Sequence, residues 1–143
     1  MPGTIPLEIL TPTRVLFEGE VTTFRAPGTL GQFQVLPDHA SMVSTLEIGH
    51  IDFRDTDGKD HIAATSGGYV EVLKTGITVL ATTAEFGDDI DVDRATQAME
   101  RAKERLSKPF ESQTIDERMQ SQNRARRALE RAMNRLQIAS KGH

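Results

Sequence analysis

The chain has 143 residues and a net charge of −4, with 27% charged, 37% apolar and only 5% aromatic residues. This length fits one ordinary domain, or a small domain with an appendage. Cysteine is absent, which excludes disulfides and thiolate metal sites; no apolar run approaches the roughly 20 residues of a membrane span, and no signal peptide is expected.

Strand patterns separated by glycine or proline fill the first part of the chain. Alternating apolar residues indicate strands near 5–9, 15–17, 20–25, 33–35, 51–53, 62–64, 70–72 and 77–81. Asp57-Gly58 predicts a hairpin turn, whereas Gly19 and Gly67-Gly68 predict breaks between strands. Because no helical pattern interrupts these segments, we expect a β-sandwich or a flattened barrel rather than a parallel βαβ sheet.

The conspicuous residues of this β part do not form a catalytic or metal-binding signature. His39, His50 and His61 lack a supporting group of ligands, so we expect structural or surface roles for them. The Gly28–Gly31 segment precedes a strand pattern, and therefore indicates a β-turn rather than a phosphate-binding loop. No pattern of nucleophile and base, or of paired carboxylates, points to an enzyme.

The pattern changes to helical near residue 88. Asp91 is a good N-cap for a helix that we expect to end near Ser107, before Lys108-Pro109. After the linker 110–113, Thr114 and Glu117 fit a capping box that opens a second helix. The residues predicted on the inner faces are Ala95, Ala98, Met99, Ala102 and Leu106 of the first helix and Ile115, Met119, Ala125, Leu129, Ala132, Met133 and Leu136 of the second.

The short linker predicts that the two helices pack as an antiparallel hairpin. Alanine and arginine favour each helix locally. An alanine seam, however, buries little apolar area, at about 25 cal/mol for each Å². We therefore expect a weakly held helix pair that is able to separate.

The two parts of the chain carry opposite charge. Residues 1–87 contain 5 Lys and Arg against 11 Asp and Glu, whereas residues 94–143 contain 12 against 6. Opposite charges favour docking of the two parts, or docking of the basic part onto an acidic partner. Two oppositely charged parts that each face solvent, without docking onto anything, would give the same composition. Arg131 and Arg135 share a helix face and could clamp a phosphate or a carboxylate.

A β-sandwich adaptor whose basic hairpin binds nucleic acid is the alternative function. The acidic chain as a whole and the lack of an aromatic residue on the second helix argue against it.

Five motifs follow one another along almost the whole chain. They are Gln32-Phe33-Gln34-Val35-Leu36-Pro37-Asp38-His39-Ala40, Ser66-Gly67-Gly68-Tyr69-Val70-Glu71-Val72, Ile77-Thr78-Val79-Leu80-Ala81, Ile90-Asp91-Val92-Asp93-Arg94-Ala95 and Arg131-Ala132-Met133-Asn134-Arg135-Leu136. Each is weakly specific, but in this order and with the β-to-helix change they are highly specific. The chain resembles the epsilon subunit of bacterial and chloroplast F-type ATP synthases.

This resemblance implies a flattened antiparallel β-sandwich of about ten strands in residues 1–87, followed by a two-helix hairpin in residues 88–143. It implies a non-catalytic rotor subunit of the central stalk, whose sandwich binds the gamma subunit and the c-ring. Gln32 and His39 are the expected contacts with the c-ring, and Gln34 stands where the family usually has glycine. Membrane association is expected only through the complex, at the cytoplasmic face of a bacterial plasma membrane rather than a thylakoid.

The resemblance also implies regulation by the hairpin. Extended along gamma, the hairpin blocks ATP hydrolysis, and Arg124, Arg126 and Arg127 are the expected contacts with the catalytic head. Folded, it binds ATP in some bacterial relatives. The matching residues here are Asp91, Arg94, Arg131 and Arg135. ATP is then a regulatory ligand, no cofactor is required, and nucleic acid is not an expected partner.

Overall fold

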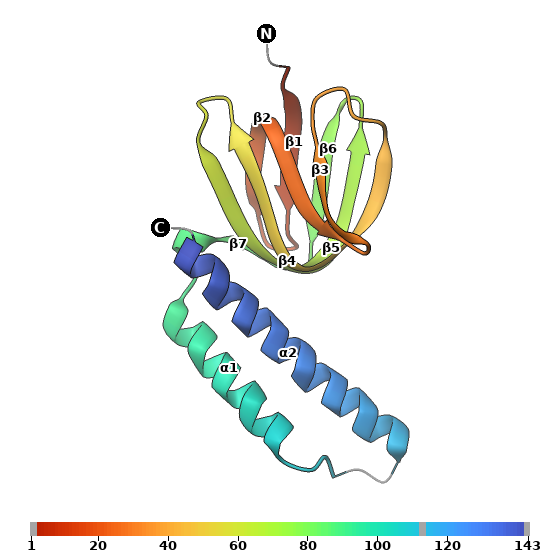
Figure 1. Ribbon diagram of the computed structural model, residues 1–143, viewed down its shortest axis with the longest axis vertical. Coiled ribbons are helices and arrows are strands. Elements are labelled where there is room, and N and C mark those ends of the chain that lie inside the picture. Colours follow the sequence, from red (N-terminus) through yellow and green to blue (C-terminus); the bar gives the residue numbers. More distant parts are fainter. Residues whose placement is uncertain (1–2, 112–113, 142–143) are drawn as a thin grey trace.

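The computed structural model describes residues 3–111 and 114–141, which form a β domain with two helices extending from one end of it (Figure 1). The strands are β1 (Ile5–Leu10), β2 (Val15–Gly28), β3 (Gly31–Val35), β4 (Met42–Asp55), β5 (Asp60–Leu73), β6 (Gly76–Ala81) and β7 (Ala84–Phe86). A single 3₁₀ turn, η1 (Gly87–Asp89), leads to the helices α1 (Val92–Ser107) and α2 (Ile115–Lys141).

The strands close on themselves, as the predicted sandwich or flattened barrel requires. Their order is β1-β6-β5-β4-β2-β3, and β1 also pairs with β2, so that five strands complete a ring. Side chains that alternate along the strands fill the interior; Ile5, Leu7 and Ile9 of β1 are all buried there, as their spacing predicts. One pair departs from the expected antiparallel arrangement, because β1 and β6 run parallel.

The expected number of about ten strands is wrong for the described residues, which form seven. Two predicted breaks are absent, since β2 continues through Gly19 and β5 continues through Gly67 and Gly68. Gly67 and Gly68 adopt φ angles of 123° and 136°, which bend β5 without ending it. The bend lets one long strand serve both layers of the sandwich.

The transition from strands to helices contains one element that the sequence pattern did not predict. The strand pattern of the sequence stops at Glu85, yet Ala84–Phe86 forms β7 and pairs with β5. Ala84 and Ile90 are buried on either side of η1. The chain is therefore held against the sandwich until α1 begins.

Both helices begin at the predicted caps. Asp91 Oδ1 accepts a hydrogen bond from the backbone N of Arg94 at 3.1 Å, and Thr114 Oγ1 accepts one from the backbone N of Glu117 at 3.1 Å. Ser112 and Gln113 of the predicted linker lie outside the described residues. The helices are neighbours along their length (Figure 1), which confirms the antiparallel hairpin.

The seam between the helices is narrower than predicted. Its fully buried side chains are alanines, namely Ala95, Ala102, Ala125 and Ala132. Ile115, Met119 and Met133 were predicted on the inner face but are 66%, 56% and 51% exposed. At about 100° for each residue, Met133 lies well round the helix from its buried neighbour, and small alanine side chains bury only a thin stripe.

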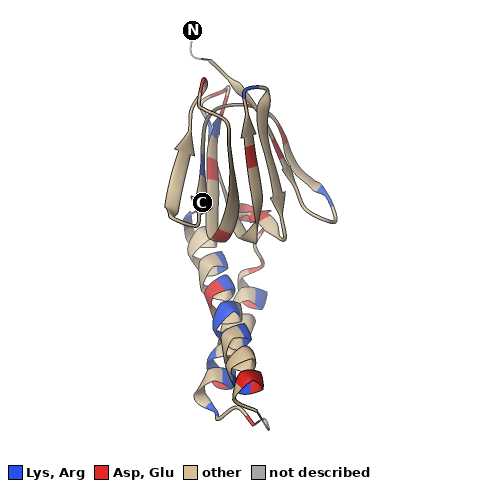
Figure 2. Cartoon of the chain, turned by 90° about the vertical axis from the view of Figure 1, so that its right-hand side faces the viewer, with Lys and Arg blue, Asp and Glu red and all other residues tan. Residues whose placement is uncertain are grey.

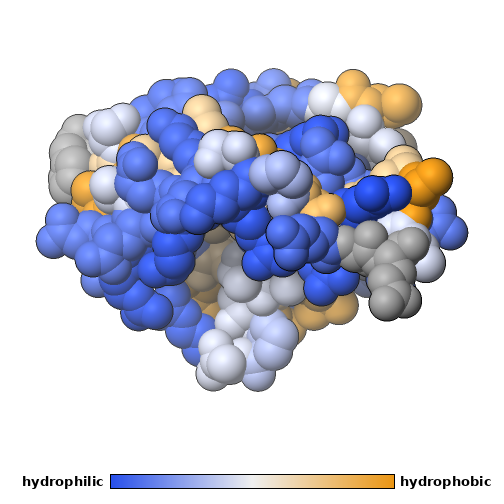
Figure 3. Space-filling view, turned by 90° about the horizontal axis from the view of Figure 1, so that it is seen from below, coloured by the Kyte–Doolittle hydropathy of each residue, from blue (hydrophilic) through white to orange (hydrophobic). Residues whose placement is uncertain are grey.

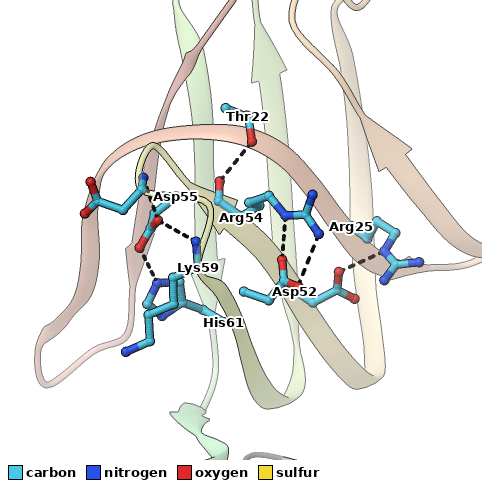
Figure 4. Close-up of polar contacts among 9 residues, drawn as sticks. Thr22, Arg25, Asp52, Arg54, Asp55, Lys59 and His61 are labelled. Carbon is cyan, nitrogen blue, oxygen red and sulfur yellow. Dashed lines mark hydrogen bonds and ion pairs between the residues drawn. The ribbon is translucent and has the colours of Figure 1, made fainter. Parts of the chain in front are cut away.

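The turn between β4 and β5 is the predicted hairpin, and a carboxylate organises it (Figure 4). Asp55 accepts hydrogen bonds from the backbone N–H groups of Asp57 and Lys59, at 2.9 and 3.0 Å, and from His61 Nε2 at 2.8 Å. The hydrogen bond from His61, followed by that from the Lys59 backbone, lowers the pKa of Asp55. Gly58 supplies the left-handed residue of the turn, with φ of 80°.

Replacing Asp55 with Asn should lower the melting temperature by a few degrees at pH 7. Since the pKa of Asp55 is lowered in the folded state, its carboxylate stabilises the fold above the ordinary value of about 4, and this contribution is lost as pH falls through the lowered pKa. The difference between wild type and Asp55→Asn should therefore shrink below about pH 4. Melting curves from pH 3 to pH 7 measure it, with Asp57→Asn as the control; a difference independent of pH would contradict this account.

Gly68→Ala should destabilise the sandwich far more than Gly58→Ala. Both glycines need a positive φ, but a Cβ at Gly68 would lie 2.1 Å from the Leu80 carbonyl oxygen, whereas a Cβ at Gly58 meets nothing within 4 Å. We expect a loss of roughly 3 kcal/mol or more for Gly68→Ala and about 1 kcal/mol for Gly58→Ala. Urea unfolding provides both values, and equal losses would show that backbone strain alone matters.

Candidate functional site at the junction of sandwich and hairpin

The hairpin is joined to the sandwich through the last turns of α2. Asn134 Nδ2 donates a hydrogen bond to the Gly49 carbonyl oxygen at 2.7 Å. One residue further, Arg135 Nε forms an ion pair with Glu85 Oε1. Ile138 is 1% exposed and packs in a small apolar cluster. We call Asn134, Arg135 and Ile138 the latch.

The latch cluster is separate from the main core. Ile138 packs with Ala64 of β5, Ile90 and Ala139, and Ile62 covers their edge. Burying one isoleucine contributes about 1.5–3 kcal/mol, which makes Ile138 the largest apolar contribution that α2 makes to the attachment. The inner-face pattern of α2 does not include Ile138, because the residue faces the sandwich rather than α1.

A groove of about 740 Å³ lies beside the latch, between the base of the sandwich and the hairpin. Its walls come from both parts of the chain. The lining residues that the argument uses are Thr11, Thr13, Arg14, Ser66, Thr82 and Thr83 from the sandwich and Arg131 and Arg135 from α2. The charged residues of the lining are therefore three arginines, Arg14, Arg131 and Arg135, and one carboxylate, Glu85, which is paired with Arg135.

The structure brings together only part of the predicted nucleotide-binding set. Arg131 and Arg135 both line the groove. Asp91 acts as the N-cap of α1, and Arg94 donates its backbone N–H to that cap; neither residue lines the groove. Arg14 does line it, and sequence reasoning missed this residue because only tertiary structure places the β1–β2 turn next to α2.

The two expected c-ring contacts lie toward different ends of β3 (Gly31–Val35). Gln32 is near its start, where Gln32 Nε2 lies 3.3 Å from His50 Nε2. His39 follows the other end, in the loop between β3 and β4 at the top of Figure 1, where its Nδ1 donates to the Ala40 carbonyl oxygen at 3.0 Å. A partner that contacts both residues must span the length of β3.

The expected contacts with the catalytic head are accessible. Arg124, Arg126 and Arg127 are exposed on α2 and form no ion pair with a described residue. Figure 2 shows blue cationic residues along the hairpin and red acidic residues on the sandwich, which matches the charge asymmetry of the sequence. From below, the surface is largely hydrophilic, with separate hydrophobic spots (Figure 3).

The outer face of strands β6, β5 and β4 exposes a row of apolar side chains. Tyr69 is directly opposite Leu80 on β6, and Val43 on β4 is opposite Glu71. Tyr69, Leu80 and Val43 are 55%, 54% and 64% exposed. With Glu71 among them, this outer face offers apolar contact together with negative charge.

Residues 3–111 and 114–141 contain no group of His, Asp and Glu side chains placed to hold a metal ion. Within the same ranges, no helix is long and apolar enough to cross a membrane.

Comparison with known proteins gives matches along the whole chain. The sequence-family model for the β-sandwich domain of the ATP synthase delta/epsilon chain matches residues 4–87, and that for its long α-helix domain matches residues 88–140. The chain is 40% identical over 139 residues to the ATP synthase epsilon chain of Syntrophomonas wolfei, covering 97% of this chain and 96% of that one. It is 37% identical over 138 residues to that of Bacillus pumilus, covering 96% and 98%.

Solved structures share the fold. A chain of the Euglena gracilis mitochondrial ATP synthase has a TM-score of 0.77 at 21% identity, covering 94% of this chain and 80% of that one. A chain of the Tetrahymena thermophila mitochondrial ATP synthase central stalk and c-ring has a TM-score of 0.58 at 11% identity, covering 95% and 93%. None of these matches supports a nucleic-acid-binding adaptor.

Ile138→Ala should release the end of α2 while leaving the sandwich folded. Truncating a buried isoleucine costs about 2–5 kcal/mol, and here the loss falls on the attachment of the hairpin rather than on the main core. Amide hydrogen exchange in residues 134–141 should accelerate, with β-strand protection unchanged. Met133→Ala, at a side chain that is 51% exposed, is the matched control. Unchanged exchange in Ile138→Ala would rule out the latch.

Proposed function

The chain belongs to the epsilon family of ATP synthase central-stalk subunits, and we propose that it acts there as a non-catalytic rotor element whose hairpin regulates ATP hydrolysis. The observation that carries this proposal is the division of the fold. Residues 4–87 and 88–140 match two separate domains of the family, and α2 meets the sandwich through the latch. A closed sandwich with a hairpin held at one end suits a stalk subunit with a movable regulatory part.

We assign stalk docking to the sandwich, residues 1–87. Its outer face exposes the apolar side chains of Val43, Tyr69 and Leu80, which suit the apolar centre of a subunit interface. We propose that this face binds the gamma subunit. Gln32 and His39 remain the proposed c-ring contacts, each at its own end of β3.

We assign regulation to the hairpin, residues 88–143. Release of the latch would free α2, and the unpaired guanidinium groups of Arg124, Arg126 and Arg127 could then meet an acidic segment of the catalytic head. The alanine seam opposes separation of α1 and α2 only weakly, since each alanine buries little apolar area. The attachment at the latch then controls how readily the hairpin extends.

ATP is the proposed regulatory ligand, and no cofactor is required. Arg131 and Arg135 supply positive charge at the groove, and the carboxylate of Glu85 is already paired with Arg135. A ligand that binds only the folded state shifts the equilibrium toward it, by an amount set by its preference for that state. ATP would therefore oppose extension of the hairpin and relieve inhibition.

The proposed location is peripheral, at the cytoplasmic face of a bacterial plasma membrane, with attachment through the complex. The chains of Syntrophomonas wolfei and Bacillus pumilus, which align over nearly their full length, are bacterial and support this location.

Deleting residues 90–143 should raise ATP hydrolysis by the assembled synthase severalfold, while the sandwich still co-purifies with the gamma subunit. The deletion removes the inhibitory hairpin but leaves β1 to β7 intact. Hydrolysis by purified complexes and subunit composition on a denaturing gel measure the two effects. Loss of co-purification would contradict stalk docking by the sandwich, and unchanged hydrolysis would contradict regulation.

A full-length variant tests whether the positive charge of α2, rather than the mere presence of the hairpin, causes inhibition. Arg124, Arg126 and Arg127 changed together to Gln should weaken inhibition without altering assembly. The matched control changes Arg101, Lys103 and Arg105 of α1 to Gln, which removes the same charge from the neighbouring helix. Equal effects of the two triple variants would mean that only the net charge of the hairpin matters.

A further inference from the structure

The strand β3 leaves one of its edges unpaired. It pairs with β2 along its length, from Gly28 opposite Gly31 to Phe24 opposite Val35, and no other strand of the described residues pairs with it. Its other edge presents backbone N–H and C=O groups, which form a template for a further strand. We propose that a second copy of this chain pairs along this edge, β3 antiparallel to β3, with Phe33 of each copy at the twofold axis.

The composition of the edge favours pairing. No charged residue occurs between Arg25 and Asp38, although 27% of the chain is charged. Natural proteins commonly protect edge strands with lysine, an inward charge, proline or a bulge. The strand β3 (Gly31–Val35) contains none of these residues and pairs with β2 without a register shift. Leu30, just before β3, is 102% exposed, and Leu36, just after it, is 46% exposed. The edge is therefore neutral, with an exposed leucine at each end.

The backbone of β3 determines which residues can pair. The β2–β3 turn has two residues, so the pair that closes this hairpin exchanges hydrogen bonds. Hydrogen-bonded and non-hydrogen-bonded pairs then alternate along the ladder, which directs the backbone groups of Gln32 and Gln34 to the free edge. Pro27 lies opposite Gln32, at a non-hydrogen-bonded position where its lack of an N–H costs nothing. Pairing about Phe33 sets Gln32 against Gln34 of the second copy, and these are the residues whose backbone groups are available.

The side chains are self-complementary in the same register. The even-numbered residues from 30 to 36 are all exposed and share one face of the strand. Across the twofold axis, Gln32 faces Gln34 and Leu30 faces Leu36. Amide side chains can donate hydrogen bonds to each other and accept them, and the facing leucines remove apolar surface from water. Each contact occurs twice in the symmetric pair, as in an isologous interface.

The proposed contact is small. A single strand edge contributes few hydrogen bonds, each worth about 0.5–1.5 kcal/mol net, and contacts of small area are typical of weak association. The dimer therefore forms at high chain concentration and dissociates on dilution. Pairing also covers Gln32, the proposed c-ring contact. This last point rests on the proposed function: the dimer is a form of the free chain, whereas the assembled stalk holds the monomer.

Sedimentation velocity of the full-length chain tests the pairing between about 5 and 500 µM, a range that brackets micromolar affinities. Wild type should change from monomer to dimer across this range. Gln34→Lys places a like charge on both edges and should weaken dimerisation roughly tenfold. The matched control Gln97→Lys, at an exposed position of α1, adds the same charge elsewhere and should dimerise as wild type does.

A double variant tests the register. In the chain with Gln32→Glu and Gln34→Lys, each lysine lies opposite a glutamate of the second copy, so dimerisation should recover. Amide hydrogen exchange measured by NMR should slow at Gln32 and Gln34 as the concentration rises. Exchange at Phe33, whose backbone groups point to β2, should not change. Circular dichroism checks that each variant is folded.

The outcomes separate self-pairing from the rotor role. A wild-type chain that stays monomeric throughout the range overturns the proposal, as does a dimer that Gln34→Lys leaves unchanged. A double variant that dimerises as weakly as Gln34→Lys overturns the register about Phe33. A subcomplex of gamma and the c-ring, added to the dimer, should bind the monomer and dissociate the dimer. Binding of the intact dimer would contradict shared use of the edge, and would leave both self-pairing and stalk docking in place.

Discussion

The attachment of α2 at a single end governs how the two parts of this protein behave together. Ile138 enters a small cluster at the base of the sandwich, and Asn134 and Arg135 tie the preceding turn to Gly49 and Glu85. The rest of the hairpin relies on a narrow alanine seam. The sandwich, closed by pairing of β1 with β2 and β6, needs none of these contacts for its own core. The fold therefore divides into a sandwich that has its own core and a hairpin that is attached to it at one end.

The opposite charges of the sandwich and the hairpin influence which surface the hairpin binds. The sandwich is acidic and the hairpin basic, so the two attract each other, but α2 keeps unpaired arginines that a more acidic partner could bind. The groove beside the latch collects positive charge from both modules, through Arg14 and Arg131. Binding of α2 by an acidic partner would therefore compete with its attachment to the sandwich.

Sequence patterns were sufficient where the cause of a structure is local. The alternation of Ile5, Leu7 and Ile9 predicts β1 because strand side chains alternate, and Asp91 predicts the start of α1 because its carboxylate caps the helix. Gly67-Gly68 predicts a break, but β5 continues through both glycines with positive φ angles, and at Gly68 the neighbouring Leu80 carbonyl oxygen leaves no room for a Cβ.

Features that depend on tertiary structure could not be predicted from the sequence. Arg14 reaches the groove only because the β1–β2 turn lies next to α2, and Ile138 is buried only because α2 extends past α1 to the sandwich. Gln32 and His39 are close in sequence, yet Gln32 lies near the start of β3 and His39 lies beyond its end. The five motifs identified the family because they occur in the family's order along the chain. The geometry of the candidate site could be described only from the three-dimensional structure.

The most direct test of a detachable hairpin is a distance measurement within the assembled synthase. The chain has no cysteine, so spin labels can be placed at Lys59→Cys, on the β4–β5 turn, and at the exposed Met119→Cys on α2, and their separation measured by pulsed electron resonance with and without ATP. Two distances are expected without ATP, with the population of the folded state increasing when ATP is added. One unchanging distance under both conditions would contradict a hairpin that leaves the sandwich.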